Sequence, residues 1–289
     1  MNIKILIPVF NDWDSLNKLL EEINLIINGL GHNFSVLIIN DASTESRSEN
    51  LLSLDNFQSV KVINMRENRG HARCNAAGLK YILENEDFDY VIPMDGDGED
   101  RPEEIKQFID NLNYHPSKVI VGERVKRSEG IFFRFCYFVH KIITFVFTGQ
   151  SIKFGNYTFL PKLVVQKMID EKATWSSFSG SLAKIEKDRA TVPSIRGSRY
   201  FGPTKMNFKS LLIHSLSIIG VFKISLIIRS ILFSLFYFFL ISENISIITL
   251  VPIFLIIILV ILTLLVSKRE NMEEFNNSLS NINNIEKIK

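Results

Sequence analysis

Two long apolar runs separated by a short polar turn constrain this chain more than any other feature. Ile245 to Val266 carries no charge, and Ile224 to Ser242 carries only Arg229, which is close enough to one end to snorkel toward water. The uncharged run would form a helix about 33 Å long, which covers the hydrocarbon core of a bilayer. We predict a two-helix transmembrane hairpin over residues 224–266, with two buried core helices as the alternative.

Basic residues flank this hairpin, whereas the turn at its tip, Ser242-Glu243-Asn244, contains none. Because Lys and Arg gather on the cytoplasmic side of membrane proteins, both outer ends and the N-terminal domain are expected in the cytoplasm. We therefore expect a multi-pass protein of the cell (inner) membrane. The basic residues are Lys205, Lys209, Lys223 and Arg229 before or at the start of the hairpin, and Lys268 and Arg269 after it.

Composition excludes some classes of protein. The formal net charge is +2, so the strongly basic balance typical of nucleic-acid binding is lacking and no nucleic-acid partner is expected. Cys74 and Cys136 are far apart and match no metal-binding spacing, which fits a reducing compartment. The first apolar run, Ile3 to Phe10, is too short for a secretory signal and contains Lys4 and Pro8.

The N-terminal part alternates β-rich runs with helical patterns, which is typical of a doubly wound, mostly parallel α/β sheet. Ligands of such sheets bind beyond the carboxyl ends of the strands. The expected strands are Lys4–Pro8, Ser35–Asn40, Val60–Asn64, Tyr90–Met94 and Lys118–Val121. The expected helices are Asp14–Leu30, Thr44–Leu54, His71–Glu84 and Pro102–Asn113.

Two further segments, Ile131 to Thr148 and Met206 to Phe222, mix apolar and aromatic residues with polar side chains at helical spacing. We predict amphipathic helices lying in the plane of the lipid headgroups, with core helices of the globular domain as the alternative. The expected organisation is an N-terminal domain over residues 1–204 that includes the candidate interfacial helix 131–148, a juxtamembrane amphipathic helix over 205–223, the hairpin over 224–266 and a polar cytoplasmic tail over 267–289.

The most informative stretch is an acidic loop directly after the expected strand Tyr90–Met94. It contains Asp95, Asp97 and Glu99, whose oxygens suit Mg²⁺ or Mn²⁺, ions that bridge to diphosphate oxygens and stabilise a departing nucleotide. A calcium loop of the EF-hand type is excluded, because Asp100 and Lys106 stand where that loop needs Gly and Glu. A solvated acidic turn remains the alternative.

Two other motifs follow expected strands. Asp41 can accept hydrogen bonds from a base or a ribose, although Ser43 or Thr44 beside it can simply cap a helix. The run Asn68 to Arg73 opens a helix, and we interpret His71 within it as a structural hydrogen-bonding residue rather than a catalyst.

Cations accumulate near the proposed membrane surface at Arg124, Arg127 and Arg196 to Lys205. A phosphate ligand needs such cations, and Arg offers the bidentate geometry that phosphate accepts. Ordinary juxtamembrane positive charge is the alternative, and both roles can hold at once.

Taken in order, these motifs resemble those of the inverting family 2 glycosyltransferases, which have the GT-A fold. The similarity is to their polyprenyl-phosphate group, such as dolichol-phosphate mannose synthase and bacterial undecaprenyl-phosphate glucosyltransferases, and it spans roughly residues 3–266. The matching motifs are Ile7 to Asp12, Ile39 to Thr44, Asn68 to His71, Met94 to Glu103, Gly122 to Arg124, and Arg199 to Lys205.

The resemblance implies roles for individual side chains. The nucleotide-sugar would be held by Pro8, Phe10, Asp12, Asp41, Arg69 and Asp95. The metal, Mg²⁺ or Mn²⁺, would be held by Asp95, Asp97 and Glu99. The acceptor phosphate would be held by Arg124, Arg127, Arg199 and Lys205. The catalytic residues would be Asp95, Asp97, Arg124 and Lys205.

The chain departs from the family pattern at three positions. Glu99 stands where the group usually has Gln, which makes the metal site more anionic, and Asn40 replaces the first Asp of a usual Asp-Asp pair. Asn156 occupies a position that is often acidic in relatives, so carboxylate chemistry is not expected there.

By this resemblance we expect an inverting transferase that moves a sugar from a UDP- or GDP-sugar to a polyprenyl phosphate at the cytoplasmic membrane face. A phosphate acceptor is already nucleophilic at neutral pH, whereas a hydroxyl acceptor requires a general base. The alternatives are a membrane glycosyltransferase that extends a polysaccharide or glycolipid at a hydroxyl, and a catalytically silent membrane scaffold. Expected partners are the donor, the lipid and the membrane, and a homo-oligomer is left open.

Overall fold

The computed structural model describes residues 1–47, 54–126, 131–203 and 207–289. The chain divides into two compact units, each of which is considered by itself. Unit 1 comprises Met1–Ser128, Lys153–Lys205 and Asn271–Lys289, and unit 2 comprises Glu129–Ile152 and Met206–Glu270.

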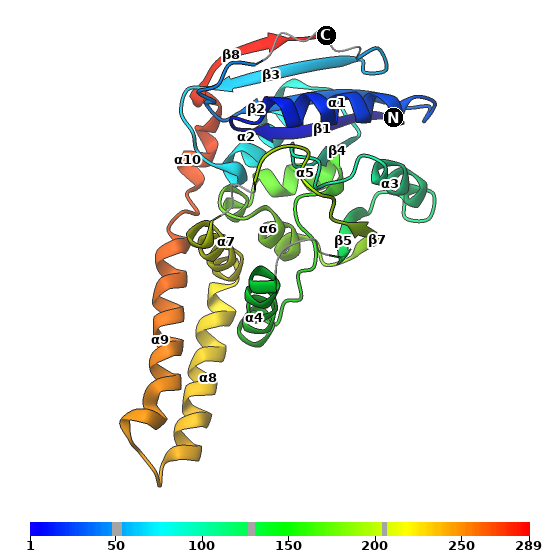
Figure 1. The fold of residues 1–289 in the computed structure, drawn as a ribbon. Helices are drawn as coiled ribbons and strands as arrows, with labels where there is room; N and C mark the ends of the chain where they lie inside the picture. The colour runs from blue at the N-terminus through cyan, green and yellow to red at the C-terminus, as the bar shows by residue number, and fades with distance from the viewer. Residues whose placement is uncertain (48–53, 127–130, 204–206) are drawn as a thin grey trace. The chain divides into compact units, whose positions relative to one another are not determined.

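Unit 1 is built on an eight-stranded mixed sheet (Figure 1). Its strand order is β7 (Arg189–Ile195), β5 (Val119–Lys126), β6 (Thr158–Pro161), β4 (Tyr90–Pro93), β1 (Asn2–Val9), β2 (Asn33–Asn40), β3 (Ser59–Met65) and β8 (Ile282–Lys287). β1 to β4 are parallel, β6 is antiparallel to β4 and β5, β7 is parallel to β5, and β8 is antiparallel to β3. The expected mostly parallel α/β fold is confirmed.

Helices cover both faces of this sheet. α1 (Trp13–Ile27) and α3 (Glu104–Leu112) share one hydrophobic core with the strands. α2 (His71–Asn85) packs on β1 and β2 and also contacts α5 (Lys162–Ile169) and α6 (Phe178–Ile185).

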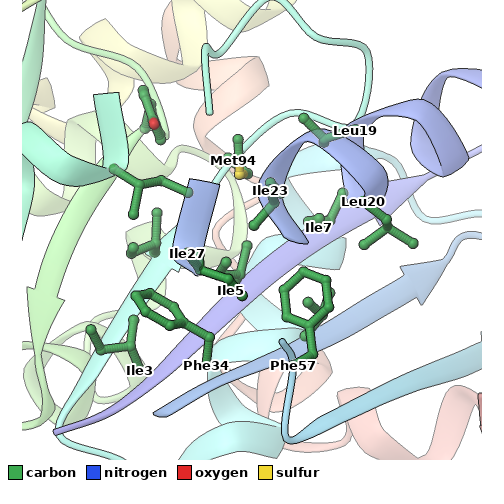
Figure 2. Packing of buried hydrophobic residues seen from close by; sticks show 14 of the residues in the cluster. Ile3, Ile5, Ile7, Leu19, Leu20, Ile23, Ile27, Phe34, Phe57 and Met94 are labelled. Atoms are coloured by element: carbon green, nitrogen blue, oxygen red, sulfur yellow. The ribbon is translucent and has the colours of Figure 1, made fainter. Parts of the chain in front are cut away.

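Alternation of side chains along β1 separates the two faces. Ile3, Ile5 and Ile7 are fully buried and point into the cluster formed with α1 (Figure 2). Leu6 lies between them in sequence, so it points to the opposite face, where it meets α2.

Gly78 lets α2 approach the sheet closely. A Cβ atom at this position would lie 2.4 Å from Cδ1 of Leu6 and 3.2 Å from Cγ1 of Ile39, both of which are buried. Only a residue without a side chain permits this helix–sheet spacing, which in turn fixes where the N-terminus of α2 emerges.

Strand directions bring distant segments to one edge of the sheet. The loops after β1, β2, β3, β4, β5 and β7 all leave at the carboxyl edge, because these strands run in the same direction. The antiparallel β6 and β8 begin at that edge, so the residues that precede Thr158 and Ile282 lie there as well. The sequence predicts the first part of this convergence and not the strands β6, β7 and β8.

Two segments differ from expectation. Residues 44–47 and Leu54 are not helical, and the rest of the expected helix Thr44–Leu54 lies outside the described residues. The cause is visible at Asn11, whose Oδ1 accepts hydrogen bonds from the backbone amides of Thr44 (2.8 Å) and Glu45 (3.1 Å) and ties them to the loop after β1.

The end of the chain is folded rather than extended as a tail. After residue 270 it forms α10 (Met272–Asn276), a 3₁₀ turn η2 (Ser278–Asn281) and the edge strand β8 (Figure 1). Polar composition suggests a solvated tail, but an edge strand needs only one buried face, and β8 obtains its backbone partners from β3.

Unit 2 consists of apolar helices. α4 (Ile131–Thr148) and α7 (Phe208–Val221) correspond to the two expected amphipathic segments. α8 (Lys223–Ile241) and α9 (Ile247–Ser267) form the expected hairpin, and among the described residues two helical segments are long and apolar enough to cross a membrane. Their apolar side chains are largely exposed, for example 74% for Phe239 and 84% for Ile247, so they are not core helices of this chain.

Polar contacts join the helices of unit 2 to one another. The Arg229 guanidinium donates from Nη1 to the carbonyl of Val146 (3.0 Å), close to the C-terminus of α4, where a cation is favoured. Lys223 pairs with the buried carboxylate of Glu270 at 2.9 Å, which joins the start of α8 to the end of the hairpin.

We predict that Gly78→Ala destabilises unit 1. Helix propensity alone would make this substitution stabilising by about 1 kcal/mol, whereas overpacking of a closed core costs about 1–3 kcal/mol. The thermal midpoint of the purified protein should therefore fall, and fall further for Gly78→Val. An unchanged or higher midpoint for Gly78→Ala would show that the helix can move away from Leu6 at no cost.

Candidate active site

The first carboxylate of the acidic loop is held by α2. Asp95 follows β4, and its Oδ1 lies 2.9 Å from Nε2 of His71, the first residue of α2. Nδ2 of Asn156 approaches the same Oδ1 at 3.4 Å. Desolvation acts to lower the pKa of His71, but the Asp95 carboxylate raises it above the ordinary histidine value. The imidazole therefore favours its protonated form beside an ionised Asp95.

Asp97 is bound by Arg199, which lies 102 residues further along the chain. Its Oδ2 accepts a hydrogen bond from Nη1 of Arg199 at 2.6 Å, and Nη2 of Arg199 binds Asp12. Asp12 stands at the N-cap of α1 but makes no capping bond, so its carboxylate serves Arg199 instead. Nε of Arg199 is buried and has no hydrogen-bond partner among the described residues.

A strap formed by residues 196–200, which follow β7, covers the acidic loop. Its backbone amides at Gly197 and Tyr200 donate to the carbonyls of Glu99 (2.8 Å) and Asp97 (3.0 Å). Glu99 forms an ion pair with Arg196. Gly98 has a φ of +85°, and a Cβ there would collide with the Tyr200 ring at 2.3 Å, so glycine is required under the strap.

Negative charge is crowded inside this loop. Burial and the charge of Asp95 raise the pKa of Asp97 to about 6, although Arg199 opposes the shift. Burial and Asp95 likewise raise the pKa of Asp100 to about 8, and Oδ2 of Asp100 accepts the amide of Asp95 at 2.9 Å. The loop thus holds more carboxylate than its present cations neutralise, which is the electrostatic setting that a divalent cation relieves.

Arg124 supplies positive charge from β5. Its guanidinium lies over Gly155, where a Cβ would come within 2.6 Å of Nη2, and its charge lowers the pKa of both Asp95 and Asp100 against the effect of burial. The strand register shifts between Arg124 and Lys126, and such bulges commonly redirect side chains beside functional sites.

Asp41 is engaged by backbone rather than left open for a ligand. Its two carboxylate oxygens accept the amides of Arg69 and Gly70, both at 2.8 Å, and the side chain is buried. Its backbone carbonyl accepts Nδ2 of Asn68 at 3.1 Å. In this arrangement Asp41 shapes the loop before α2.

The neighbouring Asn40 also has a structural partner. Its Oδ1 accepts the amide of Ser43 (3.0 Å), and its Nδ2 donates to Oδ1 of Asn64 on β3 (2.7 Å). An aspartate at position 40 could not donate to Asn64, which gives a physical reason for the departure from the family pattern.

The remaining predicted nucleotide residues are divided between the edge and the interior. Phe10 is 41% exposed at the carboxyl edge, whereas Pro8 is buried within β1. Arg69 reaches Glu67 at 2.9 Å and Glu274 at 2.9 Å.

The structure therefore brings Asp12, Asp95, Asp97, Glu99, Arg124 and Arg199 to one site, and places Asp41 and Arg69 in the adjoining loop. Arg127 and Lys205 lie outside the described residues. Glu99 faces Arg196, and within the described ranges no three His, Cys, Asp or Glu side chains are grouped to hold a metal ion. The sequence placed Arg196 among the cations near the proposed membrane surface but did not pair it with Glu99, and it assigned no role at the site to Asp100 or His71.

Solved structures show the same fold. Glucosyl-3-phosphoglycerate synthase from Mycobacterium tuberculosis, in complex with Mn²⁺, UDP-glucose and phosphoglyceric acid, aligns with a TM-score of 0.56 at 13% identity and covers 78% of this chain and 79% of its own. TarS of S. aureus, residues 1–349 in complex with UDP-GlcNAc, aligns with a TM-score of 0.50 at 13% identity and covers 80% of this chain and 70% of its own.

Curated relatives are more similar in sequence. The undecaprenyl-phosphate 4-deoxy-4-formamido-L-arabinose transferases of Salmonella paratyphi B and Salmonella newport are each 25% identical over 216 residues, which is 73% of this chain. The chain spans 64% of the length of these relatives.

The family model described as Glycosyl transferase family 2 matches residues 4–161, more than half of the chain, and this stretch contains most of β1, all of β2 to β6 and the acidic loop. The family resemblance drawn from the motifs is thereby confirmed, and the chain belongs to glycosyl transferase family 2.

Proposed function

We propose that this chain is an inverting glycosyltransferase that moves a sugar from a UDP- or GDP-sugar to a polyprenyl phosphate at the cytoplasmic face of the membrane. Family membership supports the sugar transfer, and relatives named as undecaprenyl-phosphate transferases support the lipid acceptor. The structural neighbours were solved with UDP-sugars, which supports a nucleotide-sugar donor.

The observation that carries the choice of acceptor is the state of the acidic groups at the site. Asp95 is paired with His71, Asp97 with Arg199, and Glu99 with Arg196. A hydroxyl acceptor needs a free base, whereas the His71 imidazole is engaged by Asp95, which also raises its pKa above the ordinary histidine value.

A phosphate acceptor removes this requirement. Its second pKa is near 6, so it is mostly dianionic at neutral pH and attacks the anomeric carbon without a protein base. Cations are then needed to hold it. Arg124 and Arg199 lie at the site, and the buried Nε of Arg199 has no hydrogen-bond partner among the described residues.

Mg²⁺ or Mn²⁺ fits the site in part. Asp95 and Asp97 are the carboxylates that would hold it, and the raised pKa of Asp97 is the effect expected where a cation is needed. When bound, the ion would stabilise negative charge on the leaving diphosphate. Glu99 would have to leave Arg196 to contribute, so we assign it a weaker part than the motif implies.

Membrane attachment through the hairpin agrees with the order of the two units along the chain. Residues 1–128 and 271–289 belong to the same folded unit, whereas α8 and α9 lie between them in sequence. If the hairpin spans a bilayer, both of its outer ends emerge on the same side, and the Lys and Arg distribution supports the cytoplasm as that side.

A donor and acceptor screen tests the function directly. Purified protein is incubated with UDP- or GDP-sugars and undecaprenyl phosphate or undecaprenol, and the lipid product is identified by mass spectrometry. We expect a metal-dependent glycosyl phospholipid from undecaprenyl phosphate alone. Transfer to a sugar hydroxyl instead would favour the polysaccharide or glycolipid alternative, and no turnover of any donor would favour the silent scaffold.

We predict that Asp97→Asn lowers transfer at least about 100-fold, because it removes charge that stabilises the transition state. The matched control is Asp110→Asn, an exposed aspartate on α3 outside the site. Both variants should remain folded by circular dichroism and remain in the membrane fraction. Wild-type turnover by Asp97→Asn with Mg²⁺ or Mn²⁺ would refute the assignment of this carboxylate.

We predict that a cysteine at Asn244 is labelled by a membrane-impermeant maleimide added to intact cells, whereas a cysteine at Tyr114 is not. Asn244 lies in the turn between α8 and α9, and Tyr114 is 79% exposed on unit 1. The experiment uses a Cys136→Ser background, since Cys74 is buried. Labelling of Tyr114→Cys without labelling of Asn244→Cys would reverse the orientation.

A further inference from the structure

One carboxylate from the end of the chain holds three distant segments of unit 1. Oε1 of Glu274 accepts Nη1 of Arg69 at 2.9 Å, and Oε2 accepts Nη2 of Arg73 at 3.1 Å and Nε1 of Trp175 at 2.9 Å. These donors come from the loop before α2, from α2 itself and from the turn η1 (Lys172–Trp175). Charge-assisted bonds of this kind are the strong ones among hydrogen bonds.

Packing fixes the position of this carboxylate. Phe275, the next residue, is fully buried and stacks on Trp175 with ring centroids 5.4 Å apart. Nζ of Lys80 donates to the carbonyl of Asn276 at 2.6 Å, and Asn271 caps the helix by accepting the amide of Glu274 at 3.0 Å. α10 is therefore anchored on α2, and Glu274 meets the two arginines from a fixed base.

The loop before α2, which Glu274 contacts through Arg69, leads directly into the candidate active site. Its backbone amides at Arg69 and Gly70 are held by Asp41, and the next residue, His71, binds Asp95 at 2.9 Å. Residues 69–71 thus contact four carboxylates, Asp41, Glu67, Asp95 and Glu274, and of these four only Glu274 follows the hairpin in sequence.

The strand β8 makes a second connection. Nδ2 of Asn64 donates to Oδ1 of Asn284 at 2.7 Å, and Oδ1 of Asn64 accepts Nδ2 of Asn40 at 2.7 Å. Asn40 in turn accepts the amide of Ser43 in the loop that follows β2. The C-terminal segment therefore contacts the loop before α2 directly, and it is linked to the loop after β2 through Asn64 and Asn40.

We propose that residues 271–289 help to form the donor site by holding the loop before α2 in position. Glu274 is the positioning residue, and it acts on this loop through Arg69 and Arg73. The inference rests on the proposed function for its link to the donor. Without the Glu274 carboxylate, Arg69 retains Glu67, but that residue belongs to the same loop and cannot tie it to α10.

The test compares Glu274→Ala, Glu274→Gln and Glu273→Ala in the full-length protein in detergent. Glu273 is the matched control, because it lies in the same helix, carries the same charge and is exposed. Amide hydrogen exchange is followed in residues 66–75, and affinities for UDP and GDP with Mn²⁺ are measured by calorimetry. Transfer assays give separate KM values for donor and polyprenyl phosphate.

We expect Glu274→Ala to accelerate exchange in residues 66–75, because the loop before α2 loses its tie to α10. Nucleotide binding should weaken about ten-fold, which corresponds to about 1.4 kcal/mol. The donor KM should rise in parallel, with the acceptor KM unchanged. Glu274→Gln should be intermediate, since its amide oxygen still accepts, and it guards against misfolding of the alanine variant. Glu273→Ala should match the wild type.

Unchanged exchange in Glu274→Ala overturns the proposal, as does faster exchange with wild-type nucleotide affinity. An equal rise of both KM values also overturns it, because that result indicates general loosening. A wild-type protein that binds neither nucleotide contradicts the proposed function instead, and the exchange in residues 66–75 still decides whether Glu274 holds the loop.

Discussion

The structure of unit 1 depends on the need to balance a cluster of largely buried carboxylates. Asp95, Asp97, Glu99 and Asp100 lie within one short loop, and their mutual repulsion and desolvation raise the pKa of two of them. Isolated burial of such charge would be prohibitive. The loop persists because cationic side chains converge on it from α2, β5 and the strap after β7. The same groups that stabilise the loop are those that a diphosphate and a phosphate acceptor require.

The topology of the sheet brings these side chains together. Strands of one direction deliver the loops after β4, β5 and β7 to the same edge, and the antiparallel β6 begins there with Asn156. Gly78 and Gly98 allow the closest approaches, of α2 to the sheet and of the Tyr200 ring to the acidic loop. Backbone geometry, rather than long flexible side chains, therefore determines which residues meet.

Membrane attachment and the site are linked through the course of the chain. The chain enters the apolar helices of unit 2 and returns to unit 1 with α10 and β8. Glu274 and Asn284 then contact residues next to the donor loops. A segment that composition alone describes as a polar tail thus contributes side chains to the loop before α2 and to the edge of the sheet at β3.

The sequence by itself determined the features that depend on local pattern. It predicted the first five strands, with most of their ends within a few residues of the observed ones, and it predicted the apolar hairpin and the acidic loop after β4. Strand periodicity, the length of an apolar span and the spacing of carboxylates can all be recognised within a short stretch of sequence. It could not predict the pairing of Asp95 with His71, of Asp97 with Arg199 and Asp12, or of Arg69 with Glu274, whose partners are separated by up to 205 residues. Nor could it predict β8, which has a polar sequence and becomes a strand only because β3 offers a free edge. Tertiary structure decided these contacts, because a charged side chain takes whichever opposite charge the folded backbone places within reach.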